Sequence, residues 1–245
     1  RDAQESRGLG DVYKRQHKIL MMGGFFMAKI IVYNNDTDRM ETYYRDLSEA
    51  MPYNINRTLT VREFRGASGS NTMWTTKRTI QSWNSQRRLY GSPIPVGYAF
   101  RRSWEGGHTG QSQHYAGTAF DVCQQWTNAQ RATLRASAEN SGLWSYVEPV
   151  SISPTWVHFD RRQSPPACTS GGYPLIKRGS LSVYVLIAQD DLNTLGFSTG
   201  SLDGIFGNNT YKAVRKLSNN KRINCRWDYR LQYVEIITRK CCRNW

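Results

Sequence analysis

Short stretches of this 245-residue chain alternate apolar with polar residues, or concentrate β-branched and aromatic residues, and both patterns are typical of β-strands. The predicted strands are residues 29–33, 93–100, 118–122, 143–148 and 155–159, and residues 59–64 are predicted to be a strand or the approach to one. A turn that contains proline separates the last two, so we expect them to pair as a hairpin.

Three longer stretches predict helices, at residues 38–50, 72–89 and 128–141. Pro52 follows the first of them, and Gly142 ends the last. In the second, an apolar stripe that includes Trp74 and Trp83 indicates a face packed in the core rather than a ligand site. The chain therefore mixes strands with helices.

Composition divides the chain into parts. Pro, Gly and Ser are concentrated in residues 163–174, which we expect to be a linker between a domain at 27–162, with its core at 59–162, and a smaller one at 175–217. Residues 1–16 have no periodicity and no apolar face, and they resemble a translated adapter sequence. We expect them to be a non-native extension and exclude them from the fold.

Residues 112–121 read Ser-Gln-His-Tyr-Ala-Gly-Thr-Ala-Phe-Asp and place an imidazole and a carboxylate seven residues apart. Gly117 between them indicates a tight turn or a close backbone approach. His158 supplies a second imidazole further along the chain. Two neutral imidazoles and one carboxylate are the ligands of a catalytic zinc that keeps its fourth position open for water. We therefore predict that His114, Asp121 and His158 bind Zn²⁺.

Simpler interpretations compete with this one. The chain has four histidines, and a lone histidine is more often a packed or exposed side chain than a ligand. His108 lies in a Gly-rich loop, and we do not count it among the ligands because loop histidines are usually solvated. Cys123 lies two residues after Asp121 and on the same face of the predicted strand, but we expect a buried thiol there.

At these residues the chain resembles the zinc D-alanyl-D-alanine carboxypeptidases and their L-alanyl-D-glutamate endolysin relatives. The family motif Ser-x-His-x-x-Gly-x-Ala-x-Asp and its later Trp-x-His piece are matched at Ser112, His114, Gly117, Ala119, Asp121, Trp156 and His158. The resemblance covers residues 59–162. It implies an α+β fold with a small antiparallel sheet and flanking helices, one zinc ion, and cleavage of peptide bonds in bacterial cell-wall peptides.

The resemblance also implies residues that contact the substrate. The family carries an arginine just after the strand predicted at 93–100, where it contacts the substrate or the developing oxyanion. Arg101 fits this position best and Arg102 is the alternative, while a solvated arginine pair is the competing interpretation. A fixed cation there would stabilise the transition state. Ser112 and Trp156 belong to the matched motifs and are predicted to bind substrate.

The general base is the point at which the chain departs from the family. Members commonly carry Asp or Glu three residues before the last histidine, and this chain has Thr155 there. Hydrolysis needs a base that takes a proton from water. Glu148 is the first candidate, because the predicted hairpin would bring it near His158. Asp160 is the second, because it shares a strand face with His158; its alternative role is to orient that histidine.

Residues 175–217 resemble the peptidoglycan-binding domain, a unit of three short helices found on many wall hydrolases. The most specific part of this match is the Asp-Gly-Ile-Phe-Gly turn at 203–207, followed by Thr210, which is placed to cap the next helix. The resemblance implies a small all-α domain that binds the wall and does no catalysis.

The helical pattern is lost after residue 217. Codons permitted for residues 221–234, read one base out of frame, can encode the second Asp-Gly-x-x-Gly turn that the family predicts. We therefore expect residues 218–245 to be a frameshifted tail and the second domain to be incomplete.

The chain is strongly basic, with 33 Lys and Arg against 19 Asp and Glu, for a net charge of +14. This charge suits an anionic polymer such as the bacterial wall. Nucleic acid would also suit it, but the chain has no nucleic-acid-binding motif. No apolar run is long enough to span a membrane, and the five cysteines have no spacing typical of a disulfide framework or a zinc knuckle. We expect a monomer located outside the cell or at the wall, and the export route stays open.

These observations predict a zinc-dependent peptidase that cleaves peptidoglycan stem peptides, of the D-Ala-D-Ala carboxypeptidase type. Within the same class, the alternative is an endopeptidase that cuts L-Ala-D-Glu bonds or cross-links, as a phage endolysin does. From another class, the alternative is a non-catalytic cell-wall-binding protein on a decayed hydrolase scaffold. Thr155 favours this last interpretation, and the intact ligand set opposes it.

Overall fold

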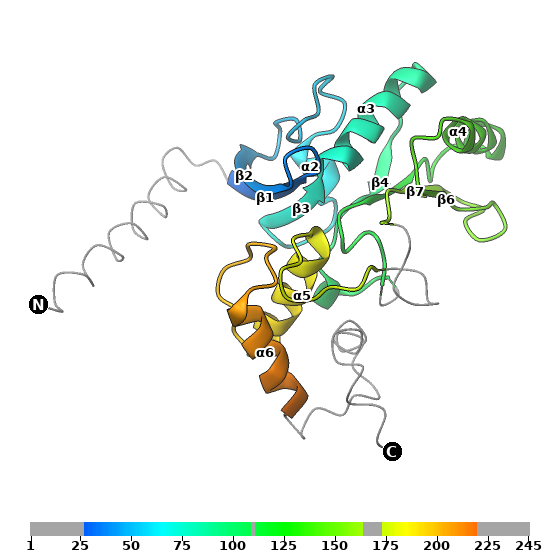
Figure 1. Cartoon of the computed structure of the whole chain (residues 1–245). Helices are drawn as coiled ribbons and strands as arrows, with labels where there is room; N and C mark the ends of the chain where they lie inside the picture. The colour runs from blue at the N-terminus through cyan, green and yellow to red at the C-terminus, as the bar shows by residue number, and fades with distance from the viewer. Residues whose placement is uncertain (1–26, 109–110, 164–172, 220–245) are drawn as a thin grey trace, which may run out of the picture.

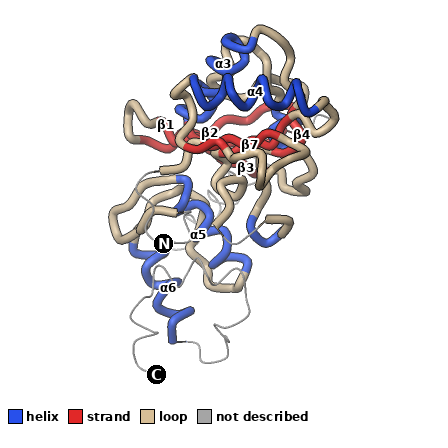
Figure 2. The backbone as a smooth tube through the Cα atoms, turned by 90° about the vertical axis from the view of Figure 1, so that its right-hand side faces the viewer, coloured by secondary structure: helices blue, strands red, loops and turns tan. Residues whose placement is uncertain are grey.

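Two small β-sheets form the middle layer of the protein, for which a computed structural model describes residues 27–108, 111–163 and 173–219. Helices α3 and α4 cover one side of the strands, and α5 and α6 lie on the other (Figures 1 and 2). The strands are β1 Met27–Asn34, β2 Arg39–Asp46, β3 Thr72–Thr76, β4 Val96–Tyr98, β5 Ala119–Val122, β6 Tyr146–Val147 and β7 Val157–Asp160. The helices are α2 Val61–Arg65, α3 Lys77–Tyr90, the 3₁₀ turn η1 Ser103–Glu105, α4 Asn128–Asn140, α5 Val183–Thr194 and α6 Asn208–Asn219.

The two sheets differ in the direction of their strands. The first has the order β2-β1-β3, in which β1 pairs antiparallel with β2 and parallel with β3. The second has the order β4-β5-β7-β6, and all of its pairs are antiparallel. The described chain is therefore α+β, as expected, but the expected small antiparallel sheet is only one of two sheets. The predicted hairpin is confirmed as β6 paired with β7.

Two predicted elements are wrong in type, and a third is a helix that starts later than predicted. Residues 38–50 do not form a helix, because Arg39–Asp46 is strand β2, whose Thr-Tyr-Tyr sequence pairs along the whole of β1. The segment predicted as a helix at 72–89 begins instead as strand β3, and α3 starts only after Thr76, whose side chain accepts a hydrogen bond from the backbone N–H of Thr79.

The predicted strand at 59–64 contains helix α2. Thr60 and Glu63 form a capping box there, in which each side chain accepts a hydrogen bond from the other residue's backbone N–H. This Thr-x-x-Glu signal outweighs the alternation of apolar residues, since it satisfies two N–H groups that would otherwise lack partners.

Aromatic side chains fill the space between α3 and the second sheet. Phe120 on β5 stacks on Trp83 of α3 at a centroid distance of 4.6 Å, and Trp144 lies against Phe159 at 4.3 Å. All four are buried. Both named tryptophans of the predicted stripe are therefore in the core, Trp74 on β3 and Trp83 on α3, and Trp83 supports the face of the second sheet opposite the predicted metal ligands.

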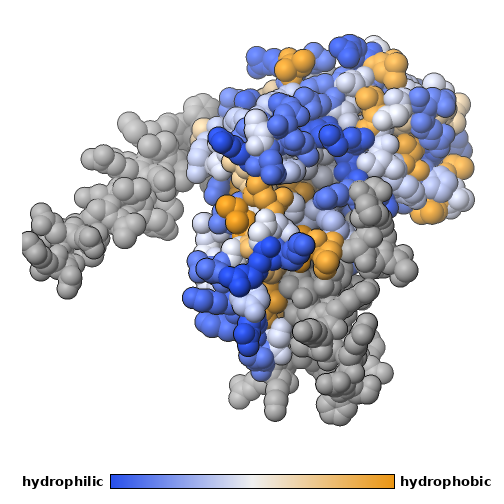
Figure 3. All heavy atoms as spheres, in the orientation of Figure 1, coloured by the Kyte–Doolittle hydropathy of each residue, from blue (hydrophilic) through white to orange (hydrophobic). Residues whose placement is uncertain are grey.

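Helix α5 joins the second part of the chain to the first. Nearly all of its residues are buried, and Asp190 pairs with Arg102 from the segment before η1. Tyr184 of α5 donates to the side chain of Gln113 at 3.1 Å. On the face seen in Figure 3, apolar residues gather where the α5–α6 region meets the sheets. The two parts therefore share one packed core.

Helix α6 begins earlier than the sequence suggests. Thr210 is its third residue and is buried; its hydroxyl accepts from Gln189 at 3.1 Å, so Thr210 does not cap the helix as predicted. The helix runs to Asn219, so residues 218–219 of the predicted tail continue it. The rest of that tail, the predicted extension at 1–16 and linker residues 164–172 lie outside the described residues, and the predicted domain limits stay predictions.

The described helices include none with the length and apolar character needed to cross a lipid bilayer.

Candidate metal centre

Strands β5 and β7 bring two of the predicted ligands together. Their antiparallel register sets Asp121 directly opposite His158, although 37 residues separate them in the chain. Directly paired residues on antiparallel strands project their side chains from the same face of the sheet. The sheet alone therefore places this carboxylate beside this imidazole.

His114 reaches the same point from the loop that precedes β5. Consecutive turns shape this loop, including a hydrogen bond from the N–H of Gly117 to the carbonyl of His114 at 3.1 Å. Gly117 has a φ of +66°, and a Cβ at this position would collide with the backbone carbonyl of Trp74. The predicted close backbone approach at Gly117 is confirmed, and it locks the loop against β3.

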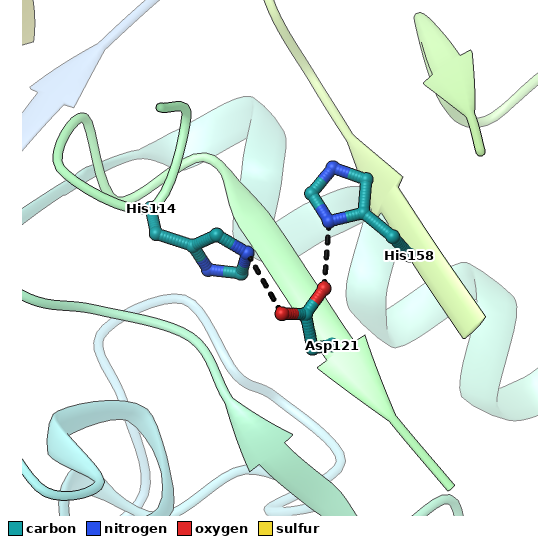
Figure 4. A group of neighbouring side chains, drawn as sticks. All are labelled: His114, Asp121 and His158. Atoms are coloured by element: carbon teal, nitrogen blue, oxygen red, sulfur yellow. Dashed lines mark hydrogen bonds and ion pairs between the residues drawn. The ribbon is translucent and has the colours of Figure 1, made fainter. Parts of the chain in front are cut away.

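The three predicted ligands form one cluster (Figure 4), and their candidate ligand atoms all lie within 4.8 Å of one another. Nε2 of His114 lies 3.2 Å from one oxygen of Asp121, and Nδ1 of His158 lies 2.7 Å from the other. His114 is 2% exposed, and the other two are partly buried. Ligands bound tetrahedrally to zinc at about 2.0 Å are about 3.3 Å apart, and the 3.2 Å between Nε2 of His114 and Asp121 is close to this value.

The outward-facing nitrogen of each imidazole has an acceptor beside it. Nδ1 of His114 lies 3.1 Å from the carbonyl oxygen of Ala99, which can only accept, so this nitrogen carries the hydrogen. Nε2 of His158 lies 3.1 Å from Asp160. Both inward nitrogens are then free to offer a lone pair toward Asp121. Lone pairs facing a carboxylate need a cation between them, either a proton or a metal ion.

The charges in the cluster fit this account. Burial by itself would lower the pKa of His158, but the carboxylates of Asp121 and Asp160 outweigh burial and raise it to about 9. For Asp121, burial acts to raise the pKa, and the neighbouring imidazoles of His114 and His158 bring it well below its usual value. Without a metal, a proton on His158 therefore fills the role of the cation.

A pocket of about 420 Å³ opens above the cluster, and all three ligands line it. Ser112, Glu148, Trp156 and Asp160 also lie in its wall, so the fold brings these predicted site residues together. Glu148 is placed by strand pairing, because its backbone N–H donates to the carbonyl of His158 at 2.9 Å. Ser112 accepts from the backbone N–H of His114 at 3.3 Å.

Asp160 is fully buried and already has partners. Arg162 donates to it from Nε at 2.9 Å and from Nη2 at 2.6 Å, and Nε2 of His158 lies 3.1 Å from Oδ2, the oxygen that Nη2 also contacts. Burial acts to raise the pKa of Asp160, but Arg162 and His158 lower it. The carboxylate is thus held as an anion that orients His158, which is the alternative role considered for it.

The two candidate arginines diverge. The Arg101 guanidinium lies 5.3 Å from the Tyr98 ring centre and donates to the carbonyl of Gly106 at 3.2 Å. Arg102 turns to α5, where Nε donates to Asp190 at 2.7 Å. Neither arginine lines the pocket. Arg102 is held away from it by a buried ion pair, so the structure does not bring this predicted substrate residue to the site.

His108 is a pocket residue that the sequence interpretation left out. Its ring stacks on His114, with centroids 4.4 Å apart and planes 17° from parallel. Its Nε2 is buried without a hydrogen-bond partner among the described residues. Burial, with the neighbouring His114, lowers its pKa to about 4, so it stays neutral near pH 7. Its position in a Gly-rich loop gave no signal of this burial.

Cys123 does not join the cluster. It is buried in the hydrophobic core, and burial raises the pKa of its thiol to about 12. The expected buried thiol is therefore confirmed. The other four cysteines lie outside the described residues.

Comparison with known proteins concerns the second part of the chain. Residues 183–221 match the family described as a peptidoglycan binding domain. The match begins at α5 and extends through α6. No curated protein and no solved structure matches the chain. The chain therefore carries a peptidoglycan-binding domain, which associates it with the cell wall.

Proposed function

We propose that the protein is a zinc-dependent peptidase that cleaves peptidoglycan stem peptides. The observation that carries the proposal is the cluster of His114, Asp121 and His158, in which both imidazoles direct a nitrogen toward the carboxylate. It lies in a pocket on a chain that also has a peptidoglycan-binding domain. A metal site and a wall-binding unit on one packed body are what a wall hydrolase needs.

Zinc bound by these three residues would polarise the scissile carbonyl and lower the pKa of water at the open position. Glu148 then accepts the proton of the attacking water. It lines the pocket, whereas Asp160 is occupied by Arg162 and His158. This difference supports Glu148 rather than Asp160 as the base. It supports Asp160 as the residue that holds His158 in the orientation for metal binding.

Other pocket residues are assigned to substrate. Ser112 and Trp156 flank the ligands in the pocket wall, where they can contact the peptide on either side of the scissile bond. Arg101 lies behind the His108 loop, since its guanidinium contacts Gly106. We assign Arg101 to the binding of the peptide carboxylate or the oxyanion, a step that requires this loop to move.

Within this class, removal of the terminal D-Ala is the activity proposed first, and endopeptidase cleavage is the alternative. In the competing, non-catalytic function, the protein binds the wall through its peptidoglycan-binding domain and does not hydrolyse peptides. Thr155 favours it, because this side chain is exposed and does not line the pocket. Turnover separates the two functions, whereas zinc content does not, because an inactive scaffold can retain its metal.

The test is mass spectrometry of purified muropeptides after incubation with the full chain and zinc, with His114→Ala as the control. Loss of a single D-Ala identifies a carboxypeptidase. Cleavage inside the stem or at a cross-link identifies an endopeptidase. Products equal to those of the control, from a protein that still sediments with walls, would leave only the wall-binding function.

A further inference from the structure

A second cleft, of about 500 Å³, separates the sheet-bearing part of the chain from the start of α5. Tyr33 at the end of β1 and Arg161 after β7 lie on one side, and residues 180–184 lie on the other. The cleft shares Arg162 with the metal pocket, but none of the three predicted zinc ligands lines it. Its volume is in the range of pockets that take small ligands or part of a polymer.

The described residues that line the cleft include three arginines and no Asp or Glu. Arg162 is neutralised by Asp160. Arg78 and Arg161 differ from it, because no described carboxylate lies within salt-bridge distance of either. Two guanidinium groups in one cleft therefore have no carboxylate partner among the described residues.

Arg161 is the more constrained of these two. Its backbone N–H donates to the carbonyl of Thr118 at 2.9 Å, and this hydrogen bond fixes the position of the Arg161 backbone. Its Nε is buried and has no hydrogen-bond partner among the described residues. Burial lowers the pKa of Arg161, and the like charge of Arg78 lowers it further. A buried donor without an acceptor is costly, so an acceptor from a ligand would stabilise this arrangement.

Two helices begin at the same cleft. Thr76 caps α3 and Ser182 caps α5, and both residues line the cleft wall. These helices have 14 and 12 residues. The N-terminal end of a helix carries a partial positive charge and favours anions. The helix ends therefore add to the field of Arg78 and Arg161.

From these contacts we infer that the cleft binds an oxyanion, with Arg78 and Arg161 as its ligands. The ligand class is a phosphate or carboxylate group carried by a cell-wall polymer, because guanidinium groups match both geometrically. The inference deepens the proposed function, since it rests on the wall as the protein's substrate. It gives the wall a second contact, which lies between the catalytic part and the peptidoglycan-binding domain.

The test follows the side-chain Nε–Hε signal of Arg161 by NMR in the full chain while inorganic phosphate is added. The expected result is a saturable shift of this signal. Arg161→Gln and Arg78→Gln should each weaken phosphate binding at least tenfold, measured by calorimetry. Arg88→Gln is the matched control, because Arg88 is exposed on the same helix as Arg78 and does not line the cleft. It should change the affinity less than twofold.

Arg78 is exposed, so its variant keeps the test valid if Arg161→Gln fails to fold. Two further titrations separate the sources of the oxyanion: glycerophosphoglycerol represents a wall phosphodiester, and N-acetylmuramic acid represents a wall carboxylate. Binding of either one that is lost in the arginine variants supports the inference. Absence of binding by all three probes, or equal binding by Arg78→Gln and Arg88→Gln, would overturn it.

His114→Ala separates this inference from the proposed function. The variant removes a predicted zinc ligand and should bind phosphate within twofold of the unmodified chain. If muropeptides are not cleaved while phosphate still binds in the cleft, the peptidase proposal fails and the oxyanion site stands. If muropeptides are cleaved but phosphate does not bind, the oxyanion site fails and the peptidase proposal stands.

Discussion

Nε2 of His158 lies 3.1 Å from Oδ2 of Asp160, on the side of the imidazole that faces away from Asp121. Both residues are on β7, and the two-residue period of the strand puts them on one face. Asp160 is in turn held by Arg162. A chain of charged groups therefore leads from the second cleft to the candidate metal centre and holds the imidazole of His158 in place.

Asp160→Asn should weaken zinc binding by about 10- to 100-fold, because the amide no longer holds the imidazole of His158 as a carboxylate does. Competition with a chromophoric chelator measures the affinity. Asp36→Asn is the control, since Asp36 is a 61% exposed partner of Lys77 far from the cluster. An unchanged affinity in a folded Asp160→Asn variant would contradict the orienting role.

Zinc binding at pH 7 should release at least one proton. Mutual stabilisation with Asp121 and Asp160 raises the pKa of His158 to about 9, so the metal-free imidazole is protonated at pH 7 and must lose that proton to the solvent. Zinc affinity should therefore increase as the pH rises toward 9. Calorimetry in two buffers of different ionisation enthalpy counts the protons. A count near zero would show that His158 is already neutral.

The same shift sets the stability of the metal-free protein. Because the folded pKa of His158 is raised, its contribution to folding is complete below about pH 6.5 and is lost as the pH rises through about 9. Zinc removes this dependence, since the bound imidazole carries no proton at Nδ1. Urea unfolding at pH 6 and pH 9.5, with and without zinc, measures both effects, and parallel losses in the two forms would contradict the assignment.

Glu148→Gln should lower turnover by about 10²- to 10⁴-fold while zinc content stays the same, as expected when a general base is lost. Single-turnover assays on a purified muropeptide measure the step. Glu139→Gln is the matched control, because Glu139 is exposed on α4 and does not line the pocket. Equal rates for the two variants would assign the base elsewhere.

Gly117→Ala should destabilise the fold more than its backbone angle alone explains. Gly142 has nearly the same φ, +65°, but a Cβ there meets nothing within 4 Å. Gly142→Ala should therefore cost about 1 kcal/mol, the penalty for a left-handed alanine. At Gly117 a Cβ meets the carbonyl of Trp74. Gly117→Ala should therefore lower the free energy of unfolding by at least about 2 kcal/mol more than Gly142→Ala does. Urea titrations compare the two, and similar costs would contradict the close approach.

Removal of one partner of the Arg102–Asp190 pair should destabilise the chain by about 3 kcal/mol, because it leaves a charge buried without compensation. The two side chains are only 15% and 4% exposed. The double variant Arg102→Met with Asp190→Leu should recover most of this loss. Denaturation curves of the two single variants and the double variant measure the coupling, and additive losses would show that the pair does not act as a unit.

Local signals in the sequence were sufficient for several features. The segment from His114 to Asp121 carries two of the predicted ligands, and it also carries Gly117, the glycine that lets this loop approach β3. The alternation of His158 and Asp160 already puts both on one strand face. These features depend on neighbouring residues and on the fixed period of a strand, so they can be derived without the fold.

Other local signals were outweighed by tertiary contacts. Residues 39–46 form a strand because β1 lies beside them and satisfies their backbone hydrogen bonds. The sequence of the segment itself does not indicate this pairing. Arg101 and Arg102 are chemically equivalent neighbours, and they separate only because Asp190 of α5 attracts one of them. A residue 88 positions away cannot be inferred from local spacing.

The sequence by itself determined which residues could bind a metal and that a peptidoglycan-binding unit follows them. Only the tertiary structure decided that Asp121 pairs with His158, that the Ala99 carbonyl and Asp160 orient the two imidazoles, and that Arg78 and Arg161 share a cleft. The physical reason is that ligand chemistry resides in single side chains. Register, burial and tautomer instead depend on which distant backbone lies alongside, and folding sets this through the packing of the whole core.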